Sequence, residues 1–162
     1  MRNKIINEDG VKKLQHRITG NRQDRQWKLV ATNGCFDVVH RGHVEYLRQA
    51  KELGDILLVG LNSDESIKLL KGENRPINDQ EDRAVVLSAF EFVDYIYIFN
   101  EKRASNFLKL ARPDVYCKAG DYSLETLDES EKCMLNLCGT EVVFLPLVEG
   151  RSSTKTIERL ST

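Results

Sequence analysis

Short apolar segments recur along the chain and alternate with segments whose apolar residues share one face of a helix. The apolar segments are residues 27–32, 55–62, 94–99, 115–118 and 141–147. Residues 55–62 are almost wholly apolar, which is typical of a central parallel strand that is covered on both faces. Five strands are therefore expected.

Helical spacing appears between most of these strands. After the first strand, Val44, Leu47, Ala50 and Leu53 recur at the spacing of one helix face. Ser63 or Asp64 can cap a short helix through Leu70. Further helices are expected over 79–90, where Val86, Ala89 and Phe90 form the apolar face, around 107–110, and from the acid-rich segment 123–132. This alternation predicts an α/β fold, a single Rossmann-like doubly wound domain with a five-stranded, mainly parallel sheet flanked by helices.

The first residues differ in pattern from the rest of the chain. Val11, Leu14 and Ile18 form one weak amphipathic segment, and a polar stretch follows it up to Gln26. We therefore expect an N-terminal helix and loop extension over residues 1–26 and the main domain over residues 27–162. A peripheral support for the sheet or a dimer contact is the expected role of the extension.

Composition narrows the class of protein. The 162 residues include 24 basic and 25 acidic side chains, so no global charge favours nucleic acid or an anionic membrane surface. The start of the chain has no apolar core typical of a signal peptide, and no apolar run approaches membrane-spanning length. The four cysteines have neither zinc-ribbon spacing nor the density of a secreted disulfide scaffold. A cytoplasmic protein that binds no nucleic acid and no membrane is expected.

The candidate chemistry lies between the first strand and the following helix. Asn33-Gly34 ends the strand in a sharp turn, and His40 and His43 stand at the start of the helix with Gly42 between them. Free N–H groups and the helix dipole favour a phosphate there, and two converging imidazoles could neutralise charge that grows on a phosphoryl group. A histidine in such a place is often only a helix cap. A zinc site is disfavoured, because no third ligand follows at a recognisable spacing.

The segment from Asn33-Gly34-Cys35-Phe36-Asp37 through His40-Arg41-Gly42-His43 resembles the signature of the cytidylyltransferase-like nucleotidyltransferases. Their HxGH element binds a nucleoside triphosphate and assists attack on its α-phosphorus. Within them, the chain is most similar to bacterial heptose-1-phosphate adenylyltransferases, which occur alone or as the second domain of bifunctional ADP-heptose synthases. The resemblance runs from about Trp27 to Leu160, so it identifies residues 27–162 as the nucleotidyltransferase domain. Because the chain begins at Met1, we expect no fused kinase domain.

The resemblance also implies roles for residues outside the histidine turn. Asn62-Ser63-Asp64, Lys71-Gly72 and Arg75-Pro76 match elements that hold the triphosphate and the sugar phosphate, with Lys71 foremost. Arg83 matches an arginine near the nucleotide phosphates, although a surface ion pair would also suit its helix. Residues 118–122 match a Lys-Gly-Gly-Asp-Tyr loop that packs against the nucleotide, with Ala119 replacing the first glycine. Residues 151–154 match a Gly-Arg-Ser-Thr-Thr turn, where helix capping and phosphate binding are compatible.

The expected reaction is transfer of AMP from ATP to a sugar 1-phosphate, with pyrophosphate as leaving group and Mg²⁺ bridging triphosphate oxygens. Catalytic roles are assigned to His40, His43 and Lys71, and Asp37 is the expected metal residue. Nucleotide-binding roles are assigned to Asn33, Gly34, Cys35, Phe36, Asp37, Gly42, Asn62, Asp64, Arg83, Lys118, Gly120, Asp121, Tyr122, Arg151, Ser152, Ser153 and Thr154. Homodimers are common among such relatives. The alternatives are a glycerol-3-phosphate cytidylyltransferase and a non-catalytic nucleotide-binding module.

Overall fold

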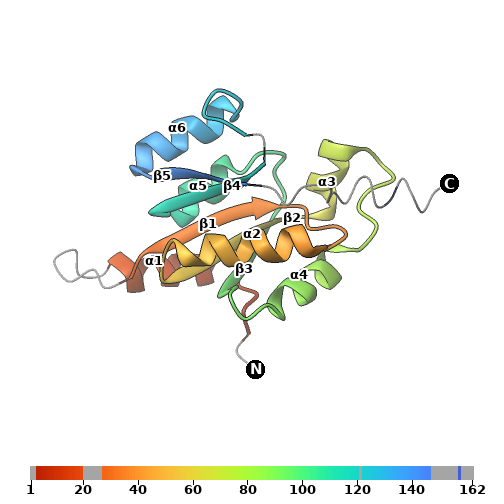
Figure 1. Cartoon of the computed structure of the whole chain (residues 1–162), viewed down its shortest axis with the longest axis horizontal. Coiled ribbons are helices and arrows are strands. Elements are labelled where there is room, and N and C mark those ends of the chain that lie inside the picture. Colours follow the sequence, from red (N-terminus) through yellow and green to blue (C-terminus); the bar gives the residue numbers. More distant parts are fainter. Residues whose placement is uncertain (1–2, 20–26, 121, 147–156, 158–162) are drawn as a thin grey trace.

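The structure is a computed structural model that describes residues 3–19, 27–120, 122–146 and 157. Helices and strands alternate along most of the described chain (Figure 1). The elements are α1 (Glu8–Thr19), β1 (Leu29–Gly34), α2 (Arg41–Glu52), β2 (Ile56–Asn62), α3 (Asp64–Lys71), α4 (Gln80–Ser88), β3 (Tyr95–Phe99), α5 (Ser105–Ala111), β4 (Val115–Ala119), α6 (Glu129–Cys138) and β5 (Glu141–Leu145). Each strand overlaps one of the five apolar segments of the sequence, and its ends differ from that segment by at most two residues.

The five strands form one sheet in the order β3-β2-β1-β4-β5, and every neighbouring pair is parallel. Thr32 of β1 lies in register with Val59 of β2 on one side and with Cys117 of β4 on the other. The doubly wound α/β fold predicted from the sequence is thereby confirmed, with a wholly parallel sheet. Because the chain winds from β1 to β3 in one direction and returns to β4, the strand order reverses between β1 and β4, where such sheets bind ligands.

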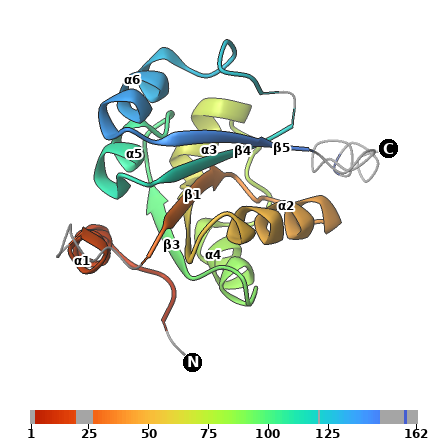
Figure 2. The same cartoon turned by 60° about the vertical axis from the view of Figure 1, so that its left-hand side comes forward.

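Helices cover both faces of the sheet, with α2 and α4 on one side and α1, α5 and α6 on the other (Figure 2). Side chains of β1 alternate between the two layers: Leu29 and Ala31 pack with α1 and α5, while Val30 packs with α2. All three are fully buried. Two apolar cores therefore hold the central strands rigidly and fix the position of their carboxyl ends.

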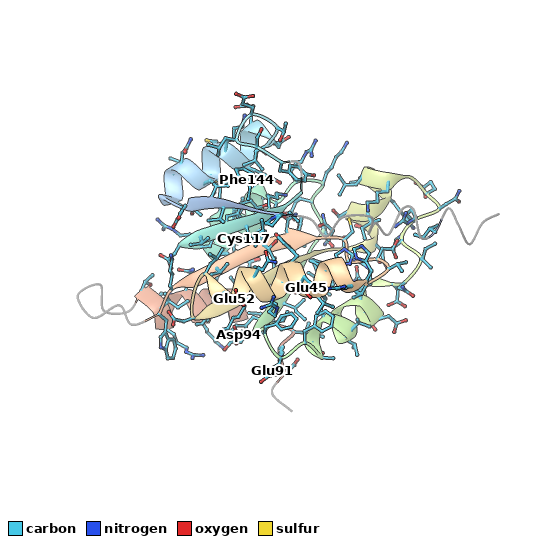
Figure 3. All side chains as sticks on the ribbon, viewed as in Figure 1. Glu45, Glu52, Glu91, Asp94, Cys117 and Phe144 are labelled. Carbon is cyan, nitrogen blue, oxygen red and sulfur yellow. The ribbon has the colours of Figure 1, made fainter. Side chains whose placement is uncertain are left out.

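Helix α2 has a clear inner and outer face. Leu47 and Ala50 are fully buried against the sheet. Glu45 and Glu52 lie along the same helix (Figure 3), and Arg48 reaches both at 3.0 and 2.7 Å. These ion pairs are exposed and stabilise the fold little, so burial of the inner face holds the helix on the sheet.

Two expectations for the helices are corrected. The buried face of α4 carries Arg83, Ala84 and Leu87, whereas Val86 is exposed, because the side chain of Arg83 turns inward and sets the orientation of the helix. Helix α6 begins at Glu129, with Asp128 as its N-cap, so the polar residues that precede Asp128 are connecting chain.

The N-terminal helix α1 packs on the sheet through Val11, Leu14 and Ile18. Just before it, the main-chain N–H of Ile6 donates to the oxygen of Ile96 at 2.9 Å, which ties this segment to the edge strand β3. Among the described residues, no helix is both long and apolar enough to cross a membrane.

Candidate active site

A cavity of about 500 Å³ opens at the carboxyl ends of β1, β2 and β4, next to the point where the strand order reverses. Most of the described residues that were predicted for the site line it. They are Asn33, Gly34, Cys35, Phe36, Asp37, His40, Gly42, His43, Asn62, Lys71, Lys118 and Tyr122. The cavity thus joins segments that lie far apart in the sequence, as expected for a doubly wound sheet.

The two histidines form the N-terminal cap of α2. His40 is the N-cap residue, and its Nδ1 accepts the main-chain N–H of Gly42 at 3.1 Å. Three residues later, Nδ1 of His43 accepts the main-chain N–H of His40 at 3.3 Å. The spacing therefore has a structural cause, because it satisfies N–H groups that a helix start leaves without partners.

This capping also fixes the chemical form of the imidazoles. Because Nδ1 of each ring accepts an N–H, the neutral ring carries its proton on Nε2. Burial, His40 and Lys71 lower the pKa of His43 to about 4. At neutral pH, His43 is thus an uncharged ring whose Nε2–H remains as a hydrogen-bond donor.

Phe36 holds His43 in place. Its ring lies 5.2 Å from the His43 ring between centroids, and its backbone adopts a left-handed φ of 46°. The Phe36 ring also passes over Gly34, where an added Cβ would come within 2.8 Å of it. Gly34 is therefore required at the end of β1 for close approach of this ring.

Cations line the cavity from α3, from the connection between β3 and α5, and from Lys118 of β4. Lys71, predicted in a loop, is the last residue of α3, and Gly72 follows it with a φ of 93°. Sequence reasoning missed Lys102 and Arg103, which line the cavity from the connection between β3 and α5. Two adjacent cations three and four residues after a strand could have signalled them. Together these groups make the cavity suited to phosphates.

Asn33 links the ends of β1 and β4. Its Oδ1 accepts from the hydroxyl of Tyr116 and, at 3.0 Å, from Nζ of Lys118. Nζ of Lys118 lies 5.2 Å from the centre of the Tyr122 ring. Burial, the largest effect, lowers the pKa of Lys118. Lys118 is therefore held by neighbours on both sides within the cavity wall.

In the structure Arg83 contacts protein groups, and its expected phosphate role stays a prediction. Its side chain is 1% exposed and does not line the cavity. It donates to the main-chain oxygens of Cys35, Asn62 and Asn78 at 2.7, 2.7 and 2.9 Å. Its remaining nitrogen, Nη2, donates to Asp64 Oδ1 at 2.7 Å, so Asp64 is likewise a partner of Arg83 and does not line the cavity. Arg83 therefore holds together the chain segments that form the site.

Asp37 likewise contacts protein groups in the structure, and its expected metal role stays a prediction. Its Oδ1 accepts the N–H groups of Ile77 and Asn78 at 2.8 and 3.0 Å, and its Oδ2 accepts Nε of Arg75 at 2.7 Å. Nη2 of Arg75 lies 2.6 Å from the same oxygen. Burial alone would raise the pKa of Asp37, but the N–H of Asn78, Arg75 and the N–H of Ile77 outweigh it and lower the pKa. Both carboxylate oxygens thus hold the 75–78 loop.

The donor set for a metal can be tested on the same residues. Within the described ranges, no group of three or more His, Cys, Asp or Glu side chains is placed to hold a metal ion. Mg²⁺ often binds through substrate phosphates and its own waters, and needs few protein ligands. The side chains described here therefore do not form a resident metal site.

Gly120 does not line the cavity, and five other predicted residues lie outside the described part of the chain. Gly120 follows β4 with a φ of 89°, and its N–H donates to the oxygen of Leu145 at 3.1 Å. Asp121, Arg151, Ser152, Ser153 and Thr154 lie outside the described residues.

Fold and cavity together define a doubly wound α/β domain with a cation-lined pocket at the point where its strand order reverses. A family model described as cytidylyltransferase-like matches residues 31–159, and the chain belongs to this family. The family expected from the histidine turn is thereby confirmed.

Curated relatives match most of the chain. It is 46% identical over 143 residues, 88% of its length, to the bifunctional protein HldE of a Nitratiruptor species, and covers 30% of that protein. It is 50% identical over 133 residues, 82% of its length, to the HldE of Campylobacter concisus, and covers 27% of it. The chain thus spans about a third or less of the length of these relatives.

Solved structures support the same fold. The lipopolysaccharide core biosynthesis protein from Thermoplasma volcanium is 28% identical, with a TM-score of 0.62 over 77% of this chain and 99% of that one. The pantoate-beta-alanine ligase from Francisella tularensis superposes with a TM-score of 0.57 at 13% identity, over 93% of this chain and 68% of that one. The second likeness shows the fold alone.

Proposed function

We propose that this chain is a nucleotidyltransferase that moves AMP from ATP to heptose 1-phosphate and releases pyrophosphate. The product would be an ADP-heptose for lipopolysaccharide or surface glycan synthesis. The observation that carries the proposal is the pair His40 and His43 at the start of α2, inside a cavity rich in cations. The similarity to bifunctional HldE proteins and to a lipopolysaccharide core biosynthesis protein supports the pathway.

The chemistry follows from the charge of the reactants. A sugar-phosphate oxygen is already ionised at neutral pH, so its attack on the α-phosphorus needs no general base. What the site must supply is alignment and stabilisation of charge on the phosphoryl oxygens. The bond to the pyrophosphate oxygen breaks as the new oxygen–phosphorus bond forms, without a covalent enzyme intermediate.

His40 and His43 fit this task through Nε2. Because Nδ1 of each ring accepts a main-chain N–H, Nε2–H is the donor that each ring would direct at an α-phosphoryl oxygen. Fixed, partly buried donors of this kind need no reorganisation when charge develops. Lys71, Lys102 and Arg103 would hold the leaving pyrophosphate and the incoming phosphate, because flexible cations can follow moving oxygens.

Mg²⁺ enters this proposal with the triphosphate. It would neutralise charge on the phosphate oxygens, while this chain's own residues bind and orient the two substrates. We place the reaction in the cytoplasm, in keeping with the free thiols of all four cysteines, and expect a homodimer as in related nucleotidyltransferases.

The test is pyrophosphate release by the purified chain with Mg²⁺, crossing ATP and CTP against D-glycero-D-manno-heptose 1-phosphate and glycerol 3-phosphate. Release with ATP and the heptose phosphate alone supports the proposal. Release with CTP and glycerol phosphate would keep the mechanism and replace the substrates. No release in any pair, from folded protein that binds ATP, would contradict the proposal and favour a nucleotide-binding module.

A further inference from the structure

Glu131 is a buried acid in a cavity that is otherwise rich in cations. It stands in the first turn of α6, is 5% exposed and lines the cavity. Its Oε1 accepts the main-chain N–H of Ala104 at 3.0 Å. The carboxylate is therefore fixed in the cavity wall by one oxygen.

The second oxygen of Glu131 faces Lys118. Oε2 lies 3.7 Å from Nζ of Lys118, and both side chains are largely buried, at 6% and 12% exposed. This distance is longer than a hydrogen bond, whereas a closed ion pair would lie near ~2.8 Å. Nζ of Lys118 donates one hydrogen bond to Oδ1 of Asn33, at 3.0 Å. Among the described residues, these contacts leave acceptor capacity on Oε2 and donor capacity on Nζ.

The chemistry of this cavity has to account for an acidic side chain among its cations. Asp37, the other acid that lines it among the described residues, is paired with Arg75 and two main-chain N–H groups. Glu131 would repel a phosphate, so it does not serve the phosphates that the cations attract. The ligand groups that it can accept from are neutral donors, and a sugar offers these as hydroxyls.

A hydroxyl beside both atoms can bridge the two side chains. Its hydrogen can be donated to Oε2 of Glu131 while its oxygen accepts from Nζ of Lys118, and both hydrogen bonds are charge-assisted. We propose that Glu131 and Lys118 form a hydroxyl-binding subsite that selects a sugar ring. This inference rests on the proposed function, which supplies two sugars: the ring of the sugar phosphate and the ribose of ATP.

Glu131→Gln tests the subsite, because the amide keeps the shape and one oxygen but loses the charge. KM for each substrate, kcat, and calorimetric affinity for ATP and for the heptose phosphate are measured on the variant and on the natural chain. The matched control is Glu129→Gln, two residues earlier on α6, where the acid is 88% exposed and pairs with Lys132. The control is expected to change none of these values.

The subsite predicts a rise of about 10- to 100-fold in KM for one substrate, with kcat within about threefold, as expected for loss of a charge-assisted hydrogen bond. A rise for the heptose phosphate assigns the subsite to the acceptor ring, and a rise for ATP assigns it to the ribose. Unchanged KM values for both, with only a lower unfolding midpoint, would overturn the proposal and leave Glu131 as an anchor for Ala104.

A second measurement uses only the natural chain, so it does not depend on whether a variant folds. The natural chain is compared on ATP, 2′-deoxy-ATP and 3′-deoxy-ATP, and on sugar 1-phosphates that lack single hydroxyls. Loss of about tenfold or more in kcat/KM for one missing hydroxyl supports the subsite, and equal use of all analogues overturns it. If the natural chain releases no pyrophosphate, the proposed function fails, and calorimetry with the same ligands then judges the subsite alone: equal affinities overturn it.

Discussion

The imidazole rings of His40 and His43 stack with 3.9 Å between their centroids, and the second ring accepts the main-chain N–H of the first residue. The same two side chains thus cap the helix through Nδ1, and in the proposed reaction they donate to the phosphoryl group through Nε2. Asparagine can imitate the first role, because its Oδ1 occupies the place of Nδ1, but it has no atom at the position of Nε2. Substitution by asparagine therefore separates capping from catalysis.

We predict that His43→Asn lowers kcat by about 10²- to 10³-fold, the loss expected for one preorganised donor in the transition state. KM for ATP changes little, and the unfolding midpoint stays near that of the natural chain because the cap is kept. Steady-state kinetics and thermal unfolding on the same preparation check both parts. His16→Asn, on the exposed surface of α1, is the matched control and retains full activity. Normal turnover by His43→Asn would refute the catalytic role.

Stability should depend on pH through His43. Its pKa is about 4 in the folded chain, against an ordinary value of 6.5, so between these values the unfolded chain binds a proton that the folded chain does not. The stabilisation is complete above pH 6.5 and is lost as pH falls towards 4, by up to about 3 kcal/mol. Urea unfolding at about pH 7, 5.5 and 4.5 should show a steeper loss for the natural chain than for His43→Asn. Parallel pH profiles would contradict the assignment.

Arg83 should contribute to the stability of the fold. Arg83→Met leaves three main-chain oxygens and Asp64 without their buried donor, so we expect the free energy of unfolding to fall by about 3 to 5 kcal/mol. Arg48→Met is the control, because Arg48 makes only exposed ion pairs on α2, and its unfolding curve should barely move. Chemical denaturation measures both. A stable Arg83→Met protein with a raised KM for ATP would instead restore the phosphate role expected from the sequence.

Asp37→Asn separates a loop-holding role from a metal role. The amide cannot accept from Arg75 and both main-chain N–H groups as the carboxylate does, so the free energy of unfolding should fall by about 3 kcal/mol. The Mg²⁺ concentration for half-maximal activity should stay within about twofold when the protein is folded. A rise of about tenfold or more in that concentration, without loss of stability, would mean that Asp37 acts on the metal.

The sequence predicted those parts of the protein that depend on local pattern. Residues 56–62 are recognisable as a buried strand because nearly every side chain is apolar, and both faces are in fact covered. The histidine turn is recognisable because its chemistry lies within a few consecutive residues. Lys118 could be placed at the site because parallel strands end at the same edge of the sheet.

Partners that lie far apart in the sequence could not be predicted in this way. In the sequence, Arg83 resembles a surface cation, because it follows acidic residues at the start of a helix. Its main-chain partner Cys35 nevertheless lies 48 residues away. Asp37 finds Arg75 at a separation of 38 residues. Glu131 sits among acids typical of a solvated first turn, and only the packing of α6 against α5 brings it to the cavity beside Lys118. Long-range pairing decides which polar side chains face a ligand and which are structural.

The bond that breaks in ATP tests the central claim most directly. We would follow ³¹P NMR spectra of the chain with ATP, Mg²⁺ and D-glycero-D-manno-heptose 1-phosphate. The account predicts that the ATP signals give way to pyrophosphate and to the coupled pair of a diphosphate-linked sugar nucleotide, which requires cleavage between the α- and β-phosphorus. Formation of ADP with a doubly phosphorylated sugar, or with inorganic phosphate, would mean transfer of the γ-phosphoryl group and would contradict it.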